Sequence, residues 1–301
     1  MPGSRQWHRL SVMQPLPDGT RLEKGPGGLD RLVLEAAEGE ALLYLQGAHV
    51  AHFQPRGERP VLWMSASSRF EAGKALRGGV PICFPWFGPK AGAPEAPLHG
   101  FARILPWAVK GVAREADGRL RATLELTAEA AARGGFPREL ALSLAVTVGR
   151  SLRMELTARN VDSAPVTFEE ALHSYFAVSD VRQVRLHGLE GIGYVDKTAA
   201  MARRPGERAP ISITAETDRV YTGATGTVTV EDPGGRRRIV VSKQGSATTV
   251  VWNPWVAKAR AMADFGDDEW TGMACVETAN ALDDAIHLAP GWRVIPAVLS
   301  T

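Results

Sequence analysis

Alternating hydrophobic residues mark a hairpin in the middle of the chain. Apolar side chains recur at every second position of 140–148 (LALSLAVTV), Gly149 and Arg150 interrupt the pattern, and it resumes in 152–158 (LRMELTA). A period of two places successive side chains on opposite faces of a strand, so each run would bury one face. The pattern predicts two antiparallel strands joined by a tight turn.

Similar short runs occur along much of the chain, with Gly, Pro, Asp and Asn at the breaks. They cover 31–47, 119–130, 226–243 and 292–300. Many strands with tight connections, and no regular alternation with long helices, are typical of an antiparallel sandwich and not of a doubly wound parallel sheet. We therefore expect an all-β architecture with a few short helices.

One helix is indicated in the last quarter of the sequence. Asn253 can cap it, Pro254 suits its first turn, and Gly266 follows the run 255–265 (WVAKARAMADF) as a stop signal. No internal repeat, low-complexity block or linker-like stretch separates two halves of the chain. A single domain over residues 1–301 is therefore expected.

The charge balance narrows the classes of partner. Lys and Arg total 35 against 33 Asp and Glu, which predicts no general attraction for nucleic acid or anionic membranes. The first 19 residues lack the apolar core of a signal peptide, and no stretch approaches ~20 uncharged apolar residues. We expect a cytoplasmic, monomeric protein. Cys83 and Cys275 lie in apolar runs and are expected to be free thiols.

Residues 76–104 form the longest segment without a regular pattern. Loops of this length in a compact domain are usually functional or disordered, and the bulky aromatic rings here argue against disorder. Aromatic faces cover the C–H surfaces of sugars, while guanidinium groups bind phosphate or hydroxyl oxygens. The arginines could equally be solvated or paired with acids. The residues concerned are Arg77, Phe84, Trp86, Phe87, Lys90, His99, Phe101 and Arg103.

His173 lies in a strand-like run, EALHSYFAV at 170–178, and three interpretations of it compete. Glu170 and His173 have the spacing of a helical metal motif, but a strand would point them to opposite faces. A packed core histidine is common, whereas imidazole also changes charge near neutral pH and suits acid–base chemistry. The residue pattern leaves the choice open.

Glu277 ends another strand-like run, in GMACVETANALDD at 272–284. A carboxylate is costly to bury unless it is paired or used, so Glu277 is either a base with a raised pKa or a surface residue. His49 and His52 lack a further ligand at metal-binding spacing, and no metal site or cofactor is predicted. No Ser or Cys lies in a nucleophile-elbow context.

Six motifs together resemble one known family. The chain contains RGGVPICFPWFG, HGFAR, HSYF, GIGYVDK, VVWNPWVAKA and CVETAN, in this order. Their order and spacing are similar to those of the hexose-6-phosphate mutarotases, also called glucose-6-phosphate 1-epimerases, of the aldose 1-epimerase superfamily. The resemblance extends over most of the chain. It implies the galactose-mutarotase-like β-supersandwich and interconversion of the α and β anomers of an aldohexose, without metal or organic cofactor.

The same resemblance assigns catalytic roles. His173 matches the family's general acid and Glu277 its general base. The two groups are expected on opposite sides of one hemiacetal, where Glu277 takes the proton of the C1 hydroxyl and protonated His173 gives one to the ring oxygen.

Binding residues carry over one by one. Arg77 and Arg103 would hold the sugar phosphate, and His99 would support the substrate near its ring. Asp196, in GIGYVDK, matches an aspartate placed to bind sugar hydroxyls, and Lys258 is a candidate for additional positive charge.

One departure from the family pattern concerns Leu98. Several relatives have a polar residue, often Gln, directly before the HG of HGFAR, so one substrate hydrogen bond is unaccounted for. Two other functions compete with a hexose-phosphate mutarotase. They are an aldose 1-epimerase for unphosphorylated sugars and a carbohydrate-binding or sensing protein without catalysis.

Overall fold

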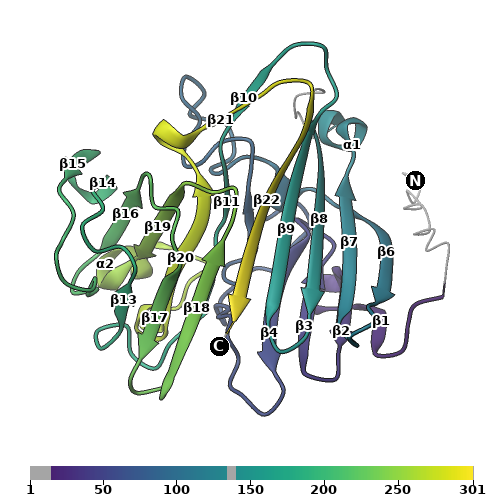
Figure 1. The fold of residues 1–301 in the computed structure, drawn as a ribbon, viewed down its shortest axis with the longest axis horizontal. Helices are drawn as coiled ribbons and strands as arrows, with labels where there is room; N and C mark the ends of the chain where they lie inside the picture. The colour runs from purple at the N-terminus through teal and green to yellow at the C-terminus, as the bar shows by residue number, and fades with distance from the viewer. Residues whose placement is uncertain (1–14, 134–139, 301) are drawn as a thin grey trace, which may run out of the picture.

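A long antiparallel sheet crosses most of the width of the molecule in Figure 1, and two further sheets lie behind it. The computed structural model describes residues 15–133 and 140–300. We call the long one the front sheet. Its eight strands are, in spatial order, β13 (Arg185–His187), β17 (Val228–Asp232), β18 (Arg237–Lys243), β22 (Gly291–Ser300), β9 (Leu152–Asn160), β8 (Leu140–Val148), β7 (Leu120–Leu126) and β6 (Ala108–Arg114).

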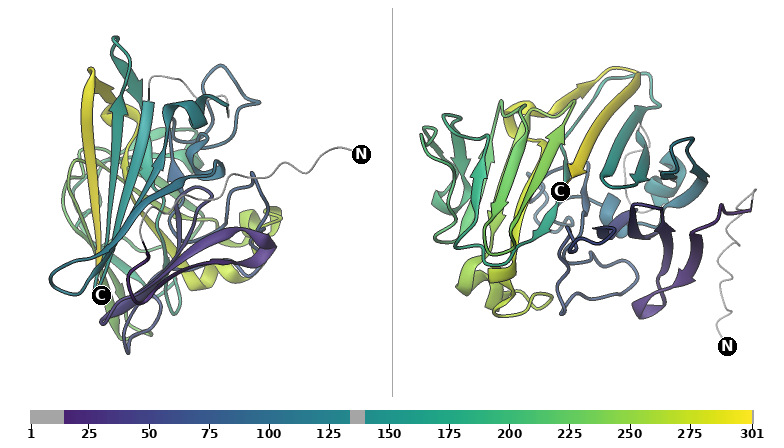
Figure 2. Two further views of the ribbon diagram at one scale, coloured as in Figure 1. Left: turned by 90° about the vertical axis from the view of Figure 1, so that its right-hand side faces the viewer. Right: turned by 60° about the horizontal axis from the view of Figure 1, so that its bottom comes forward.

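A four-stranded sheet backs one half of the front sheet, inclined to it as the left panel of Figure 2 shows. Its strands are β1 (Thr20–Lys24), β2 (Asp30–Glu35), β3 (Gly39–Tyr44) and β4 (His49–Pro55). The other half is backed by a second eight-stranded sheet, the β20 sheet. Its strands run β15 (Ala202–Arg204), β14 (Tyr194–Asp196), β16 (Thr217–Tyr221), β19 (Thr248–Asn253), β20 (Met273–Asn280), β11 (Glu170–Leu172) and β5 (Ile82–Cys83), and β12 (Tyr175–Ala177) also pairs with β20.

The remaining elements are few. A two-stranded ribbon joins β10 (Val166–Phe168) to β21 (Ile286–Leu288), and the described residues contain two α-helices, α1 (Ala128–Arg133) and α2 (Trp255–Ala261). The strands of all four sheets pair antiparallel, for example β8 with β9 and β19 with β20. The prediction of an all-β antiparallel sandwich with a few short helices is confirmed.

The predicted hairpin is confirmed as β8 and β9. Leu144 lies opposite Leu156 in the register, and both side chains are fully buried. One hydrophobic cluster joins the three large sheets, with members such as Leu34 on β2, Leu144 on β8 and Val276 on β20. Alternation along each strand therefore builds a shared core between the front sheet and the two sheets behind it.

The helix predicted over 255–265 is shorter in the structure. It ends at Ala261, where Met262 takes up an extended backbone conformation four residues before Gly266. Pro254, not Asn253, is the N-cap residue. Asn253 still satisfies the first turn, because its side-chain oxygen accepts a hydrogen bond from the Trp255 backbone N–H at 2.9 Å.

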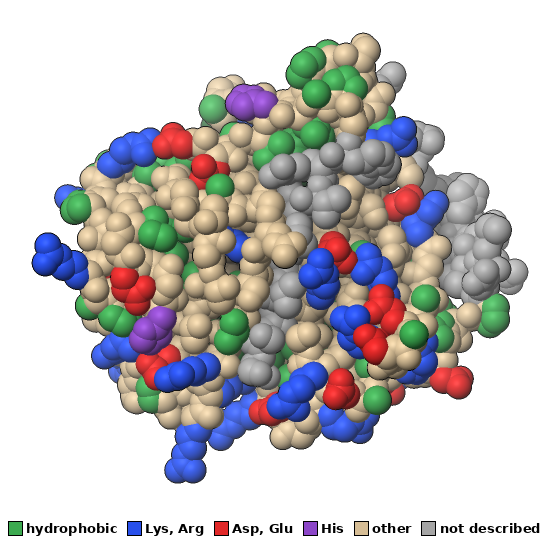
Figure 3. Space-filling view, viewed as in Figure 1, with side chains coloured by type: hydrophobic (Ala, Val, Ile, Leu, Met, Phe, Trp, Pro, Cys, Tyr) green, Lys and Arg blue, Asp and Glu red, His purple; other side chains and the backbone are tan. Residues whose placement is uncertain are grey.

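The outward surface of the front sheet carries charges of both signs. Figure 3 shows Lys and Arg side chains interspersed with Asp and Glu on this face. Arg121 and Arg153, for example, both pair with Glu155, at 2.8 and 3.0 Å. Among the described residues, none of the helices is long and apolar enough to span a membrane.

Strand register in the β20 sheet defines the face on which the candidate site is built. Val220 pairs with Val250 and Val250 with Glu277, so these three side chains share one face. The adjacent Val276 belongs to the core that faces the front sheet. Glu277 therefore points to the outer face, where Phe87 of the irregular segment packs against Val220 and Val250.

Candidate active site

His173 and Glu277 meet directly. The Nε2 atom of His173 lies 3.3 Å from Oε1 of Glu277, and the two residues are 7% and 1% exposed. His173 occupies the break between β11 and β12, two short strands that both pair with β20, which carries Glu277. The sequence predicted that the two groups flank a sugar from opposite sides, whereas the structure places them side by side.

Burial sets the protonation of this pair. It raises the pKa of Glu277 well above its ordinary value, and the nearby Asp218 adds to the effect. Burial also lowers the pKa of His173 well below its ordinary value, helped by the positive charges of Arg103 and Arg77. Each residue alone therefore favours its neutral form, which together corresponds to one proton on the pair.

The ring of His173 is held by aromatic neighbours. It stacks on Tyr175 with centroids 4.7 Å apart and an interplanar angle of 11°, and it lies edge-to-face with Trp252 at a centroid distance of 6.0 Å. Tyr175 in turn stacks on Trp63 at 5.8 Å. Sequence analysis missed Trp63 and Trp252, because only the fold brings these distant tryptophans to the histidine.

Of the aromatic residues predicted to line a pocket, Phe87 approaches the site most clearly. Its ring lies edge-to-face with the ring of His99, with centroids 5.0 Å apart. Phe84 is fully buried and packs on Phe168, and Trp86 pairs edge-to-face with Phe101. The irregular segment therefore contributes both core and site residues.

His99 lies beside His173, with ring centroids 5.7 Å apart. Its Nδ1 accepts a hydrogen bond from the Gly88 backbone N–H at 3.1 Å, so the neutral ring carries its proton on Nε2. Burial lowers the pKa of His99 well below its ordinary value, and Arg103 lowers it further. His99 thus offers a neutral hydrogen-bond donor. Gly100 permits this turn, since a Cβ there would collide with the Phe84 carbonyl oxygen.

Arg77 is fixed by two partners. Its guanidinium group forms a salt bridge to Asp264 at 3.1 Å and donates a hydrogen bond to the Tyr175 hydroxyl at 3.0 Å. The same tyrosine stacks on His173, so one side chain links Arg77 to His173.

Arg103 has no carboxylate partner in the described part of the chain. It donates a hydrogen bond to the Leu98 carbonyl oxygen at 2.6 Å, and its enclosed Nε atom has no partner there. Burial lowers the pKa of Arg103, and the positive charge of Arg77 lowers it further. Of these two guanidinium groups only that of Arg77 pairs with a carboxylate. The positive charge of Arg103 is therefore left in excess, which suits an anionic group of a substrate.

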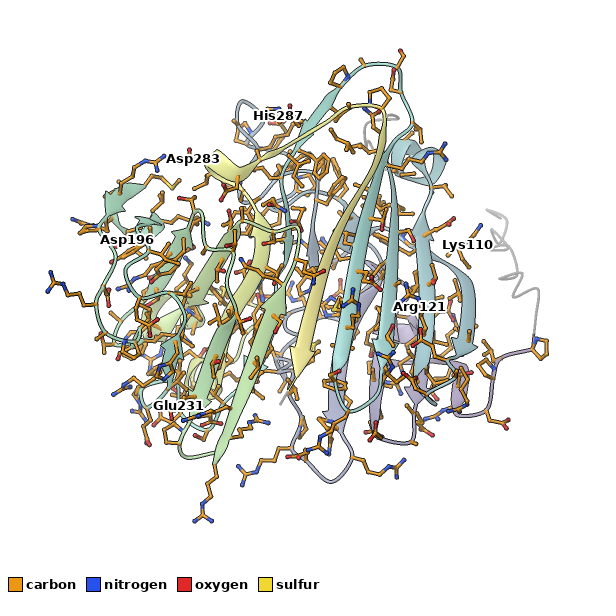
Figure 4. All side chains as sticks on the ribbon, viewed as in Figure 1. Lys110, Arg121, Asp196, Glu231, Asp283 and His287 are labelled. Atoms are coloured by element: carbon orange, nitrogen blue, oxygen red, sulfur yellow. The ribbon has the colours of Figure 1, made fainter. Side chains whose placement is uncertain are left out.

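Asp196 does not share the face of the sheet that carries Glu277. In the register it pairs with Arg219, whereas the neighbouring Val195 pairs with Val220 on the face of Glu277. Its carboxylate accepts hydrogen bonds from the Thr198 backbone N–H and hydroxyl at 3.0 and 2.6 Å. Figure 4 shows Asp196 near the outer edge of the β20 sheet. We therefore do not carry Asp196 into the proposed site.

Asp218 and Lys197, and not Asp196, lie on the face of the β20 sheet that carries Glu277. Asp218 lies opposite Trp252 in the register, and its carboxylate pairs with the Lys197 ammonium group at 3.3 Å. Burial raises the pKa of Asp218, and Lys197 opposes that rise. Neither residue was predicted. Lys197 directly follows Asp196, the last residue of β14, and lies in a 3₁₀ turn, so the strand pattern did not signal it.

The other sequence candidates have separate partners. Lys258 pairs with Glu216 at 3.0 Å on the surface, and His52 pairs with Glu40 at 3.4 Å. Glu170 is buried and accepts a hydrogen bond from Asn280 at 2.9 Å. Cys83 and Cys275 are free and buried, as predicted. Cys275 lies close enough to His173 and Glu277 for the three side chains to share a metal ion.

Comparisons with known proteins agree with this geometry. Residues 30–294 match the family model described as aldose 1-epimerase. A protein of Cenchrus ciliaris with the provisional name glucose-6-phosphate 1-epimerase is 36% identical over 283 residues, 90% of this chain and 85% of that protein. A protein of the same provisional name from Escherichia coli K12 is 36% identical over 275 residues, 88% of this chain and 90% of the relative.

Solved structures give the same fold. The crystal structure of YeaD from Salmonella typhimurium, provisionally named a mutarotase, superposes with a TM-score of 0.88 at 33% identity and covers 97% of this chain and 96% of its own. A galactose mutarotase-like protein from Lactobacillus casei superposes with a TM-score of 0.66 at 16% identity, covering 90% and 99%. The predicted mutarotase-like fold is confirmed, and the chain belongs to the aldose 1-epimerase family.

Proposed function

We propose that this protein interconverts the α and β anomers of a hexose 6-phosphate, with glucose 6-phosphate as the expected substrate. The observation that carries the proposal is the 3.3 Å contact between His173 and Glu277, on which the positive charges of Arg77 and Arg103 also act. The provisional names of the relatives in Cenchrus ciliaris and Escherichia coli support the same substrate class.

The chemistry is ring opening and closure by proton transfer. Glu277, as carboxylate, takes the proton of the C1 hydroxyl while protonated His173 gives a proton to the ring oxygen O5. The C1–O5 bond breaks, C1 becomes an aldehyde, and rotation about C1–C2 presents the other carbonyl face. Closure reverses both transfers. Each positioned proton transfer contributes roughly 10² to 10⁴-fold in rate.

The direct contact of the two groups fits this chemistry. The oxygens O1 and O5 are bonded to the same carbon, so one side of the sugar ring presents both to the adjacent His173 and Glu277. An acid and a base in contact can therefore serve the two oxygens without lying on opposite sides of the substrate.

The shared proton has two arrangements. Neutral His173 with protonated Glu277 is favoured by burial, and the ion pair that starts ring opening differs from it only by transfer of one proton. Because both arrangements hold the same number of protons, pH does not select between them. Polar contacts from the bound sugar, which stabilise separated charges, would shift the pair towards the reactive arrangement.

Binding roles follow from the surrounding charges. Arg77 and Arg103 would hold the phosphate, neutral His99 would donate a hydrogen bond near the ring, and Asp218 would accept one from a sugar hydroxyl. A free-sugar aldose 1-epimerase has no need of the excess positive charge at the two arginines, which favours the phosphorylated substrate. The exposed Leu98 adds no polar contact of its own side chain.

One comparison tests the proposal against its alternatives. Anomer exchange is followed by NMR with fresh α-glucose 6-phosphate, glucose and galactose at equal concentrations of purified protein. We expect the largest kcat/KM for the phosphorylated sugar. Faster exchange of a free sugar would favour an aldose 1-epimerase, and binding of all three without faster exchange would favour a carbohydrate-binding protein.

Three further properties stay predictions. We propose that the protein acts as a monomer, as a single domain over residues 1–301, and in the cytoplasm. Sedimentation equilibrium of the purified protein tests the first of these, since a dimer would double the measured mass.

A further inference from the structure

A thiol completes a three-residue cluster at the catalytic pair. Cys275 precedes Glu277 by two residues on β20, so the period of a strand places both side chains on the outer face. One ligand atom each of His173, Cys275 and Glu277 lies within 4.8 Å of the other two. Among the described residues, the Glu277 Oε2 atom is buried and has no hydrogen-bond partner. A nitrogen, a sulfur and an oxygen donor therefore lie close together.

The spacing is close to that of a tetrahedral metal site. Bonds of about 2.0 to 2.3 Å from zinc to nitrogen, oxygen and sulfur place neighbouring ligand atoms roughly 3.3 to 3.8 Å apart. The His173 and Glu277 atoms are already 3.3 Å apart, and the thiol needs only a small approach. Three protein ligands leave the fourth position for water, as in open zinc sites.

The donor set selects the kind of ion. Thiolate and imidazole ligands suit zinc and cobalt, whereas magnesium and calcium require oxygen ligands. The cluster also has features that weaken binding. Arg77, Arg103 and Lys197 act on the same pair with positive charge, and the buried Nδ1 atom of His173 has no partner among the described residues. Ligating histidines normally have such a partner. These features favour reversible binding over a permanently held ion.

We propose that Zn²⁺ binds reversibly to His173, Cys275 and Glu277 and inhibits the protein by occupying its acid and its base. On binding, the thiol proton of Cys275 and the proton shared by the pair pass to solvent, and no electrons are transferred. The binding step stands on the cluster alone, whereas inhibition rests on the proposed function.

Binding is measured without turnover. Chelator-treated protein is titrated with Co²⁺, whose thiolate complex gives a near-ultraviolet charge-transfer band, and with Zn²⁺ and Mg²⁺ by calorimetry. We expect one Zn²⁺ per chain, the cobalt–thiolate band, and no heat from Mg²⁺. Cys275→Ala and Cys275→Ser should lose the band and weaken Zn²⁺ binding by about tenfold or more. Cys83→Ala is the matched control, because Cys83 is equally buried but outside the cluster.

Inhibition is measured separately, as the rate of anomer exchange of α-glucose 6-phosphate against free Zn²⁺, relative to each variant's own zinc-free rate. Wild type and Cys83→Ala should be inhibited at the same Zn²⁺ concentration, and folded Cys275 variants only at about tenfold more or higher. Absence of the cobalt–thiolate band in wild type, or equal Zn²⁺ binding by Cys275→Ala, would overturn the proposal. A protein that gives the band but does not exchange anomers would refute the proposed function alone.

Discussion

The ammonium group of Lys197 lies 3.3 Å from the carboxylate of Asp218, on the face of the β20 sheet that also carries Glu277. It also lies 4.8 Å from the centre of the Phe87 ring. The positive charge of Lys197 opposes the rise that burial causes in the pKa values of Asp218 and Glu277, and it adds to the fall in the pKa of His173. Lys197 therefore adjusts the protonation of the proposed machinery without being one of its proton-transfer groups.

Replacing Lys197 by Met should move the pH profile of kcat/KM to higher pH as a whole. Loss of the positive charge makes ionised Glu277 less stable and protonated His173 more stable, so the pKa of each group rises. Both limbs of the profile then shift in the same direction. Lys110→Met is the control, because Lys110 lies on the front sheet and pairs with Glu125. A shift of one limb only, or an equal shift in the control, would contradict this role.

The wild-type profile itself should be bell-shaped. On the acid side activity is lost when the pair takes up a second proton, on His173. Because the pKa of His173 is lowered, this loss should occur at a pH below the ordinary pKa of histidine. On the alkaline side activity is lost when Glu277 gives up the shared proton. Because the pKa of Glu277 is raised, this loss should occur at a pH above the ordinary pKa of glutamate. The plateau should therefore include neutral pH. Initial rates of anomer exchange over a pH series measure this, and a profile without limbs would be incompatible with a shared proton.

Replacing Asp218 and Asp196 separately by Asn tests which of the two carboxylates binds a sugar hydroxyl. Asp218→Asn should lower kcat/KM for glucose 6-phosphate by roughly ten- to a hundredfold, the value of a charged hydrogen bond to a sugar hydroxyl. Asp196→Asn should leave kcat/KM nearly unchanged, since Asp196 caps a turn at Thr198. The substitution costs at most a small part of the stability. A larger loss in Asp196→Asn than in Asp218→Asn would restore Asp196 as the hydroxyl-binding residue.

The arginines should determine the preference for a phosphate. Removing Arg77 or Arg103 by substitution with Ala is expected to raise KM for glucose 6-phosphate about ten- to a hundredfold, with a much smaller change for glucose. Arg121→Ala serves as control, because Arg121 pairs with Glu155 on the front sheet. Equal effects on the two substrates would show that the arginines act on the sugar or on the fold and not on the phosphate.

Strand periodicity predicted the local parts of the fold. The hairpin of β8 and β9 could be predicted because its hydrophobic and polar residues alternate within one continuous stretch of the sequence. Helix α2 was predicted too long, because Gly266 is the stop signal in the sequence whereas Met262 already takes up an extended backbone. The order of strands in the sheets depends on contacts between distant segments and was not predicted, although the family resemblance implied a β-supersandwich.

The site was predictable where a residue lies in a motif. The contact between His173 and Glu277 joins two such residues, and the resemblance named both. Asp196 shows the limit, since it lies opposite Arg219 in the register, on the face away from Glu277, and the motif does not signal that orientation. Cys275 lies in a motif as well, but its distance from His173 depends on how β12 pairs with β20.

The decisive measurement is the NMR exchange rate between the α and β anomers of glucose 6-phosphate, with wild type, His173→Ala and Glu277→Gln at equal concentrations of folded protein. If the pair transfers the protons, wild type accelerates exchange, and each variant retains at most about one hundredth of that acceleration. Exchange by either variant as fast as by wild type would contradict proton transfer through His173 and Glu277.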